Sequence, residues 1–146
     1  MREISVDKNA SGIAVVTIDR PEKRNAVSLA MWGALGDAFA GLATDPEVRV
    51  VILTGAGGHF SAGADISEFE TVRNTEAAGR LYDEVSDGAE DAIHGFSKPT
   101  IAAIDGVCVG GGLGLAVACD FRIASAAARF GITAARLGIV YGLPET

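Results

Sequence analysis

The apolar positions of this chain are spaced first as in strands and then as in a helix. Two β-branched runs, residues 4–6 and 13–18, are separated by residues 7–12, which are polar and end in glycine as turns do. This pattern predicts an antiparallel hairpin. From Ser28 the apolar positions follow helical spacing, with Asp45-Pro46 placed to end the helix: Leu29, Trp32, Leu35, Phe39 and Leu42.

Strand-like and helix-like segments continue to alternate along the rest of the chain. Residues 48–54 form a β-branched run that enters a glycine-rich loop at 55–58, as a buried strand does. Residues 75–96 are polar and weakly helical. Further strands are predicted at 100–104, 107–109, 121–124 and 129–131, with a helix of small residues at 112–119. This order predicts an α/β fold in which sheets pack against helices.

The composition is that of a folded protein. Hydrophobic residues make up 49% and charged residues 21% of the 146 positions. A chain of this length can bury a core without disulfides or metals, so we expect one domain over residues 1–146. Residues 143–146 carry no helix signal, and we expect the natural protein to continue beyond them.

Charge and cysteine content narrow the possible partners and the compartment. Twelve basic residues against 19 acidic ones give a formal charge of −7, which disfavours nucleic acid and anionic membranes as partners. The N-terminus lacks an apolar signal segment, and no apolar run approaches the ~18 residues of a membrane span. Cys108 and Cys119 lie in apolar runs and are expected to be buried thiols in a reducing cytoplasm.

Two segments with small residues carry the candidate chemistry. Residues 59–66 (HFSAGADI) follow a strand and a loop, and their small side chains let the backbone approach a ligand closely. Residues 106–116 pass from glycines into a helix, whose first N–H groups favour a negative oxygen. Two converging backbone donors are what an enolate or tetrahedral oxyanion needs. The alternative is that both segments are simple tight turns.

Neither glycine-rich segment fits a nucleotide-binding motif. A dinucleotide fingerprint needs a third glycine where Leu115 stands and an acidic residue near position 130, where Arg129 and Phe130 occur. A Walker loop needs Gly-Lys-Ser/Thr, whereas Gly111 is followed by Gly112 and a leucine. No Cys/His cluster has metal-ligand spacing, so no metal is expected.

These segments resemble the crotonase (enoyl-CoA hydratase/isomerase) superfamily. Residues 20–26 (RPEKRNA) are similar to its CoA-binding turn, 60–66 to its first oxyanion loop, and 98–106 with 110–112 and 119–120 to its second. The resemblance implies a spiral of β-β-α turns, here without the C-terminal helical part. It also implies an acyl-CoA thioester as partner, no cofactor besides the coenzyme A of the substrate, and a homotrimer or dimer of trimers in the full-length protein.

The resemblance also implies roles for individual residues. The amides of Ala64 and Gly111 correspond to the oxyanion hole that holds the thioester carbonyl. Substrate or CoA contacts are implied for Lys23, Arg24, Ala26, Ala62, Asp65 and Ile66. Lys23 and Arg24 are candidates for the CoA phosphates, and a solvated basic turn is an equally good reading of that pair.

The chain departs from the family at the acid and base positions. Hydratases of the family carry two glutamates that act on a water, and the matching positions here are Gly114 and Ala134. Neither side chain can transfer a proton. Tyr141 stands where some members, methylmalonyl-CoA decarboxylase among them, carry a tyrosine, so it is a candidate for orienting a carboxylate or water; ordinary packing is the alternative. His59 and His94 are expected to be structural or exposed.

The sequence therefore predicts an acyl-CoA-processing enzyme of the enoyl-CoA hydratase/isomerase type, as in fatty acid metabolism. Two alternatives remain open. One is a decarboxylase of a malonyl-type CoA, in which the oxyanion hole alone stabilises the enolate. The other is a CoA-thioester binding protein without catalysis, because both glutamates are replaced.

Overall fold

The chain begins with a hairpin. In this computed structural model, which describes residues 3–133, β1 (Ile4–Lys8) and β2 (Ile13–Ile18) pair antiparallel. The Asn9 side-chain oxygen accepts hydrogen bonds from the N–H groups of Ser11 and Ile13, both at 3.0 Å, and thereby closes the turn. The predicted hairpin is confirmed.

Later strands extend this hairpin into a sheet. β3 (Val50–Gly55), β4 (Thr100–Ile104) and β6 (Phe121–Ala124) add in parallel, giving the order β1-β2-β3-β4-β6. β5 (Val107–Val109) and β7 (Arg129–Gly131) pair in parallel as a second, two-stranded sheet. The strands lie where the sequence predicts them, except that β1 continues two residues further, to Lys8, and β3 is shifted by one or two residues at its ends. The α/β fold is therefore confirmed.

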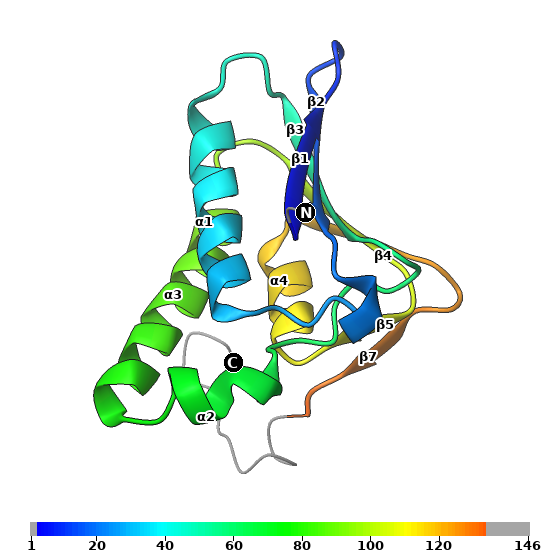
Figure 1. The fold of residues 1–146 in the computed structure, drawn as a ribbon. Coiled ribbons are helices and arrows are strands. Elements are labelled where there is room, and N and C mark those ends of the chain that lie inside the picture. Colours follow the sequence, from blue (N-terminus) through cyan, green and yellow to red (C-terminus); the bar gives the residue numbers. More distant parts are fainter. Residues whose placement is uncertain (1–2, 134–146) are drawn as a thin grey trace.

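Three longer helices cover the five-stranded sheet from the same side (Figure 1). They are α1 (Leu29–Thr44), α3 (Glu76–His94) and α4 (Gly111–Ala118), and α3 packs against both of the others. The hydroxyls of Ser28 and Thr75 cap α1 and α3 by accepting backbone N–H bonds. Within residues 3–133, none of the helices combines the length and apolar character needed to cross a membrane.

The sequence pattern did not predict three short elements. They are the 3₁₀ turns η1 (Pro21–Lys23) and η2 (Ile66–Glu68), and the four-residue helix α2 (Phe69–Val72). Elements of three or four residues are too short to show an apolar period. Of the three, only η2 has a side-chain cap: the Asp65 carboxylate accepts a hydrogen bond from the Ser67 N–H.

Successive turns of the chain stack on one another as a spiral. Each turn places a strand in the main sheet (β3, β4, then β6) and follows it with an extended segment in a second layer. In that second layer Val27 pairs with Ala64, Ser61 pairs with Cys108, and β5 pairs with β7, all in parallel. The spiral implied by the resemblance is thus present in the described residues.

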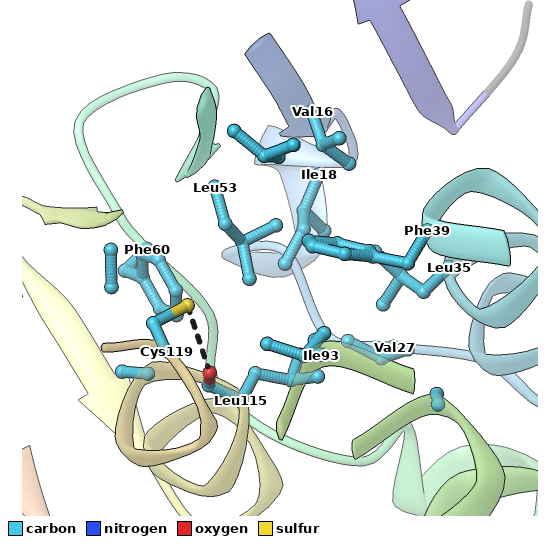
Figure 2. Packing of buried hydrophobic residues seen from close by; sticks show 14 of the residues in the cluster. Val16, Ile18, Val27, Leu35, Phe39, Leu53, Phe60, Ile93, Leu115 and Cys119 are labelled. Carbon is cyan, nitrogen blue, oxygen red and sulfur yellow. Dashed lines mark hydrogen bonds between the residues drawn. The ribbon is translucent and has the colours of Figure 1, made fainter. Parts of the chain in front are cut away.

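The core lies between the main sheet and the helices (Figure 2). Val16, Ile18 and Leu53 point from the sheet toward Leu35 and Phe39 of α1, and Ile93 and Leu115 close the core from α3 and α4. The Cys119 thiol donates a hydrogen bond to the Leu115 carbonyl oxygen at 3.5 Å. Cys108 and Cys119 are buried free thiols, as predicted, and burial raises the pKa of each to about 11.

Truncation of a central side chain should test this core. Leu53 is fully buried, so Leu53→Ala should lower the free energy of unfolding by about 2–5 kcal/mol, through lost burial and the cavity left behind. Urea unfolding followed by circular dichroism measures this. Val6→Ala, on the exposed face of β1, is the control, and equal losses in the two variants would contradict the assigned core.

Candidate functional site

Ala64 lies in an extended segment that pairs with Val27. The Val27 N–H donates to the Gly63 carbonyl at 2.8 Å, and the Asp65 N–H donates to the Val27 carbonyl at 2.9 Å. Successive peptide groups of an extended segment point to opposite sides, so the Ala64 N–H faces away from Val27. It faces the start of α4.

The two segments singled out in the sequence meet at a contact between backbones. Gly63 has a φ of +88°, and a Cβ added to it would lie 2.9 Å from the Val109 carbonyl oxygen and 3.2 Å from the Gly111 nitrogen. A Cβ added to Gly111 would lie 3.9 Å from the Ala64 nitrogen. The amides of Ala64 and Gly111 are therefore near neighbours, although 46 residues separate them in the chain.

Both amides are available as donors. Across residues 3–133, neither the Ala64 nor the Gly111 N–H donates a hydrogen bond to a protein acceptor. Gly111 is the first residue of α4, where the unpaired N–H groups and the helix dipole together favour a negative charge. The arrangement can therefore bind one oxygen that carries, or gains, negative charge.

The indole ring of Trp32 packs against Gly111. A Cβ on Gly111 would approach the Cζ2 and Cη2 atoms of Trp32 to 3.1 Å, closer than most real contacts. The Trp32 Nε1–H donates to the hydroxyl of Tyr82 at 3.0 Å, and both side chains are buried. Burial raises the pKa of Tyr82, which keeps its hydroxyl protonated. In the sequence, Trp32 is recognisable only as an apolar position of a helix.

Asn25 is a structural residue of the site that the sequence analysis missed. It is fully buried with a φ of +58°, a conformation that asparagine adopts more readily than most residues. Its side-chain amide donates to the carbonyls of Ala56 and His59 at 2.8 and 2.7 Å. Its own carbonyl accepts from the Ser61 hydroxyl, which in turn accepts from the Gly63 N–H. Asn25 thus fixes the segment that presents Ala64.

Asp65 lies at the centre of a charged cluster. Its side chain is only 5% exposed, and it accepts hydrogen bonds from Arg20 Nη1 at 2.8 Å and Lys23 Nζ at 2.9 Å. The Ser67 hydroxyl and N–H also donate to it. Burial alone would raise the pKa of Asp65, but the bonds from Ser67, Lys23 and Arg20 outweigh burial and hold that pKa well below its usual range.

The other predicted CoA-binding residues lie around this cluster. The Ala62 N–H donates to the Arg24 carbonyl at 2.9 Å, and the Ala26 N–H donates to the Lys23 carbonyl at 3.0 Å. Ile66 is 54% exposed, and the Lys23 and Arg24 side chains also reach the surface. The structure brings the 20–27 turn and the 62–66 segment together, and their contacts with CoA stay predictions. Ala134 and Tyr141 lie outside the described residues.

A cavity of about 560 Å³ opens between α3 and α4. Asp87, Glu90, Asp91 and His94 line it from α3, opposite a wall that includes Gly110 and Gly114. A Cβ built on Gly114 would lie 3.0 Å from Cδ and 3.2 Å from Oε2 of Glu90, and closer still to Oε1.

The Glu90 carboxyl group therefore fills the space next to Gly114, the position that the resemblance matches to a hydratase glutamate. Nothing in the sequence singles out Glu90, because it is one of several acidic residues on a polar helix. Burial, then the charges of Asp83 and Asp91, raise the pKa of Asp87 nearby. In the described part of the chain, no group of three or more His, Cys, Asp or Glu side chains could hold a metal ion.

The stacked strand turns are those of the crotonase class of proteins. The chain belongs to the enoyl-CoA hydratase/isomerase family, whose model matches residues 8–144. It is similar to an enoyl-CoA hydratase domain-containing mitochondrial protein of Bos taurus, at 40% identity over 99% of this chain and 50% of the relative. A mevalonyl-coenzyme A hydratase of Beauveria bassiana is 37% identical over 88% of this chain and 48% of the relative.

Solved structures show the same likeness. An enoyl-CoA hydratase/carnitine racemase from Magnetospirillum magneticum superposes with a TM-score of 0.94 at 41% identity, over 99% of this chain and 54% of that one. Enoyl-CoA hydratase from Bacillus anthracis gives a TM-score of 0.88 at 35% identity, over 95% of this chain and 54% of that one. The chain spans about half the length of the curated relatives it matches.

Removing the charge of Asp65 should destabilise the fold. Asp65→Asn leaves Arg20 and Lys23 without their shared counter-charge, so it should cost about 3 kcal/mol in urea unfolding. Because the folded-state pKa of Asp65 is lowered, its contribution is present at neutral pH and is lost as the pH falls below the usual aspartate range. Asp83→Asn, which breaks the exposed pair with Arg73, is the control and should cost less than about 1 kcal/mol. Equal effects in the two variants would show that the Asp65 cluster is not structural.

Proposed function

We propose that this chain is the acyl-CoA-binding part of an enzyme that holds the thioester carbonyl between the N–H groups of Ala64 and Gly111. The observation that carries the proposal is the close approach of these two amides from separate turns of the spiral, without a protein acceptor among residues 3–133. Membership of the enoyl-CoA hydratase/isomerase family supports the same assignment. So do relatives whose names give a CoA thioester as substrate.

The arrangement suits chemistry in which negative charge develops on the thioester oxygen. Removing one such backbone donor from an enzyme typically costs about 2.7–4 kcal/mol of transition-state stabilisation. The donors here are held in place before a substrate binds, by the Val27 pairing on one side and by Trp32 on the other. No side chain is needed for this part of the catalysis.

The surface around Asp65 is the proposed CoA site. Lys23 and Arg24 would face the phosphates, and Ala26, Ala62 and Ile66 would lie along the adenine and pantetheine. Asp65 is better suited to holding Arg20 and Lys23 in position than to touching CoA, because its carboxylate is buried and fully engaged. A trimeric assembly of the whole protein and a cytoplasmic location remain part of the proposal.

Replacement of Gly111 tests the second donor. Gly111→Pro removes the N–H at a helix position where proline is otherwise tolerated, so kcat/KM for thioester turnover should fall by about 100- to 1,000-fold. Gly111→Ala is the matched control: it brings a Cβ against Trp32 but keeps the N–H. If both variants lose activity equally, crowding of Trp32 explains the loss and the donor assignment is wrong.

Water addition should be slow in this protein. Gly114 and Ala134 stand at the two hydratase glutamate positions, and each acid or base typically contributes about 10²- to 10⁴-fold. Hydration of crotonyl-CoA by the full-length protein should therefore lie orders of magnitude below ordinary enzymatic rates, and glutamate at both positions should raise it. Rapid hydration by the unaltered protein would contradict this.

The same assays separate the other functions. Release of CO₂ from methylmalonyl-CoA would identify a malonyl-type CoA decarboxylase. Tight CoA-thioester binding without turnover of either compound would identify a binding protein.

A further inference from the structure

The cavity between α3 and α4 lies next to the proposed oxyanion site. Gly110, which precedes the donor Gly111, lies in its wall, and Gly114 lies one turn further along α4. Its volume of about 560 Å³ is in the range of pockets that enclose small organic ligands. An acyl chain whose carbonyl oxygen is held at Gly111 would extend into this space.

Glu90 brings a carboxyl group into the cavity from α3. Its Cδ and Oε2 lie 3.0 and 3.2 Å from the point where a Cβ on Gly114 would stand. Any side chain at position 114 would compete with Glu90 for this space, and a glycine leaves it to Glu90. The half-buried carboxyl group thus covers α4 where the backbone has no side chain of its own.

The spacing along α4 places this carboxyl group near the reacting carbons. Positions 111 and 114 share a helix face and are separated by about 4.5 Å along the axis. The carbon next to a thioester carbonyl is one bond from the carbonyl carbon. A carboxyl group over Gly114 therefore lies about one helical turn from the Gly111 donor, in the region that the carbons next to a bound thioester carbonyl would enter.

We propose that Glu90 is the catalytic residue that moves a proton at the carbon next to the thioester carbonyl. This inference rests on the proposed function, and it adds the acid/base group that positions 114 and 134 lack. The acid/base group comes from a different helix, α3. A single acid/base carboxyl group suits reversible proton transfer at carbon, as in isomerisation, better than water addition, which uses a paired acid and base.

The proposed proton transfer between the α-carbon and Glu90 needs no further reactant. A Glu90 oxygen forms an O–H bond with the proton of the α-carbon, and the C–H electron pair forms the carbon–carbon double bond of an enolate. The carbonyl π pair moves to the thioester oxygen, which the Ala64 and Gly111 N–H groups bind. Return of a proton from Glu90 to carbon reverses the step, and in D₂O the returned atom is deuterium.

Deuterium exchange into butyryl-CoA tests the proposal. The full-length protein in D₂O should replace the α-protons, which proton NMR follows as loss of their signal. Glu90→Gln should lower kcat for exchange by about 100-fold or more while KM changes little, because binding depends on the backbone donors. Glu84→Gln, the same change at an exposed position of α3, is the matched control and should leave exchange within about twofold.

Relocation of the carboxyl group separates catalysis from a structural role. Glu90→Ala should lose exchange, and Gly114→Glu in that background should restore at least about tenfold, because the new side chain reaches the same space from α4. Glu90→Asp should retain intermediate activity. Circular dichroism and thermal unfolding confirm that each variant is folded.

Three results would overturn the inference. Full exchange by folded Glu90→Gln would exclude Glu90 and leave the proposed function intact. Binding of butyryl-CoA by the unaltered protein without any exchange would show that no proton moves at this carbon. Absence of butyryl-CoA binding, measured by calorimetry, would refute the proposed function together with the inference.

Discussion

The rest of the site depends on a close approach between two backbones. The 62–66 segment lies so near the start of α4 that a single methyl group on Gly63 would meet both the Val109 carbonyl and the Gly111 nitrogen. This distance decides whether two N–H groups can share one oxygen. Because hydrogen bonds weaken steeply with distance and angle, the contact has to be held on both sides.

Each side of this contact has its own support. On the side of Ala64, buried Asn25 and Ser61 satisfy the backbone groups of the loops around it, and Asp65 ties the segment to Arg20. On the side of Gly111, Trp32 packs against the backbone and is itself bonded to Tyr82. Polar bonds therefore fix one donor and aromatic packing fixes the other. The two supports come from different turns of the spiral, so the paired amides require those turns to stack correctly.

Helix α3 both packs against the core and lines the cavity, although its sequence is largely polar. Tyr82, Ala89 and Ile93 bury one face against the core. The adjoining face lines the α3–α4 cavity with acidic side chains, where burial and like charges raise the pKa of Asp87. Asp87 therefore takes up a proton more readily than an exposed aspartate does.

The sequence alone determined the strands, the three longer helices and the two segments that meet at the site, because apolar periods, caps and turn residues are local signals. It also showed, by resemblance, the family and the missing glutamates. Only the tertiary structure decided that Asn25 and Asp65 are buried anchors, that Trp32 supports Gly111, and that Glu90 covers Gly114. The residues in these contacts lie far apart in the chain. The separation is 24 positions for Glu90 and Gly114 and 79 for Trp32 and Gly111. It is 45 or more for the Asp65–Arg20 and Trp32–Tyr82 contacts. Such pairings leave no periodic trace in a single chain, because they depend on how the turns of the spiral stack and not on the neighbours of each residue.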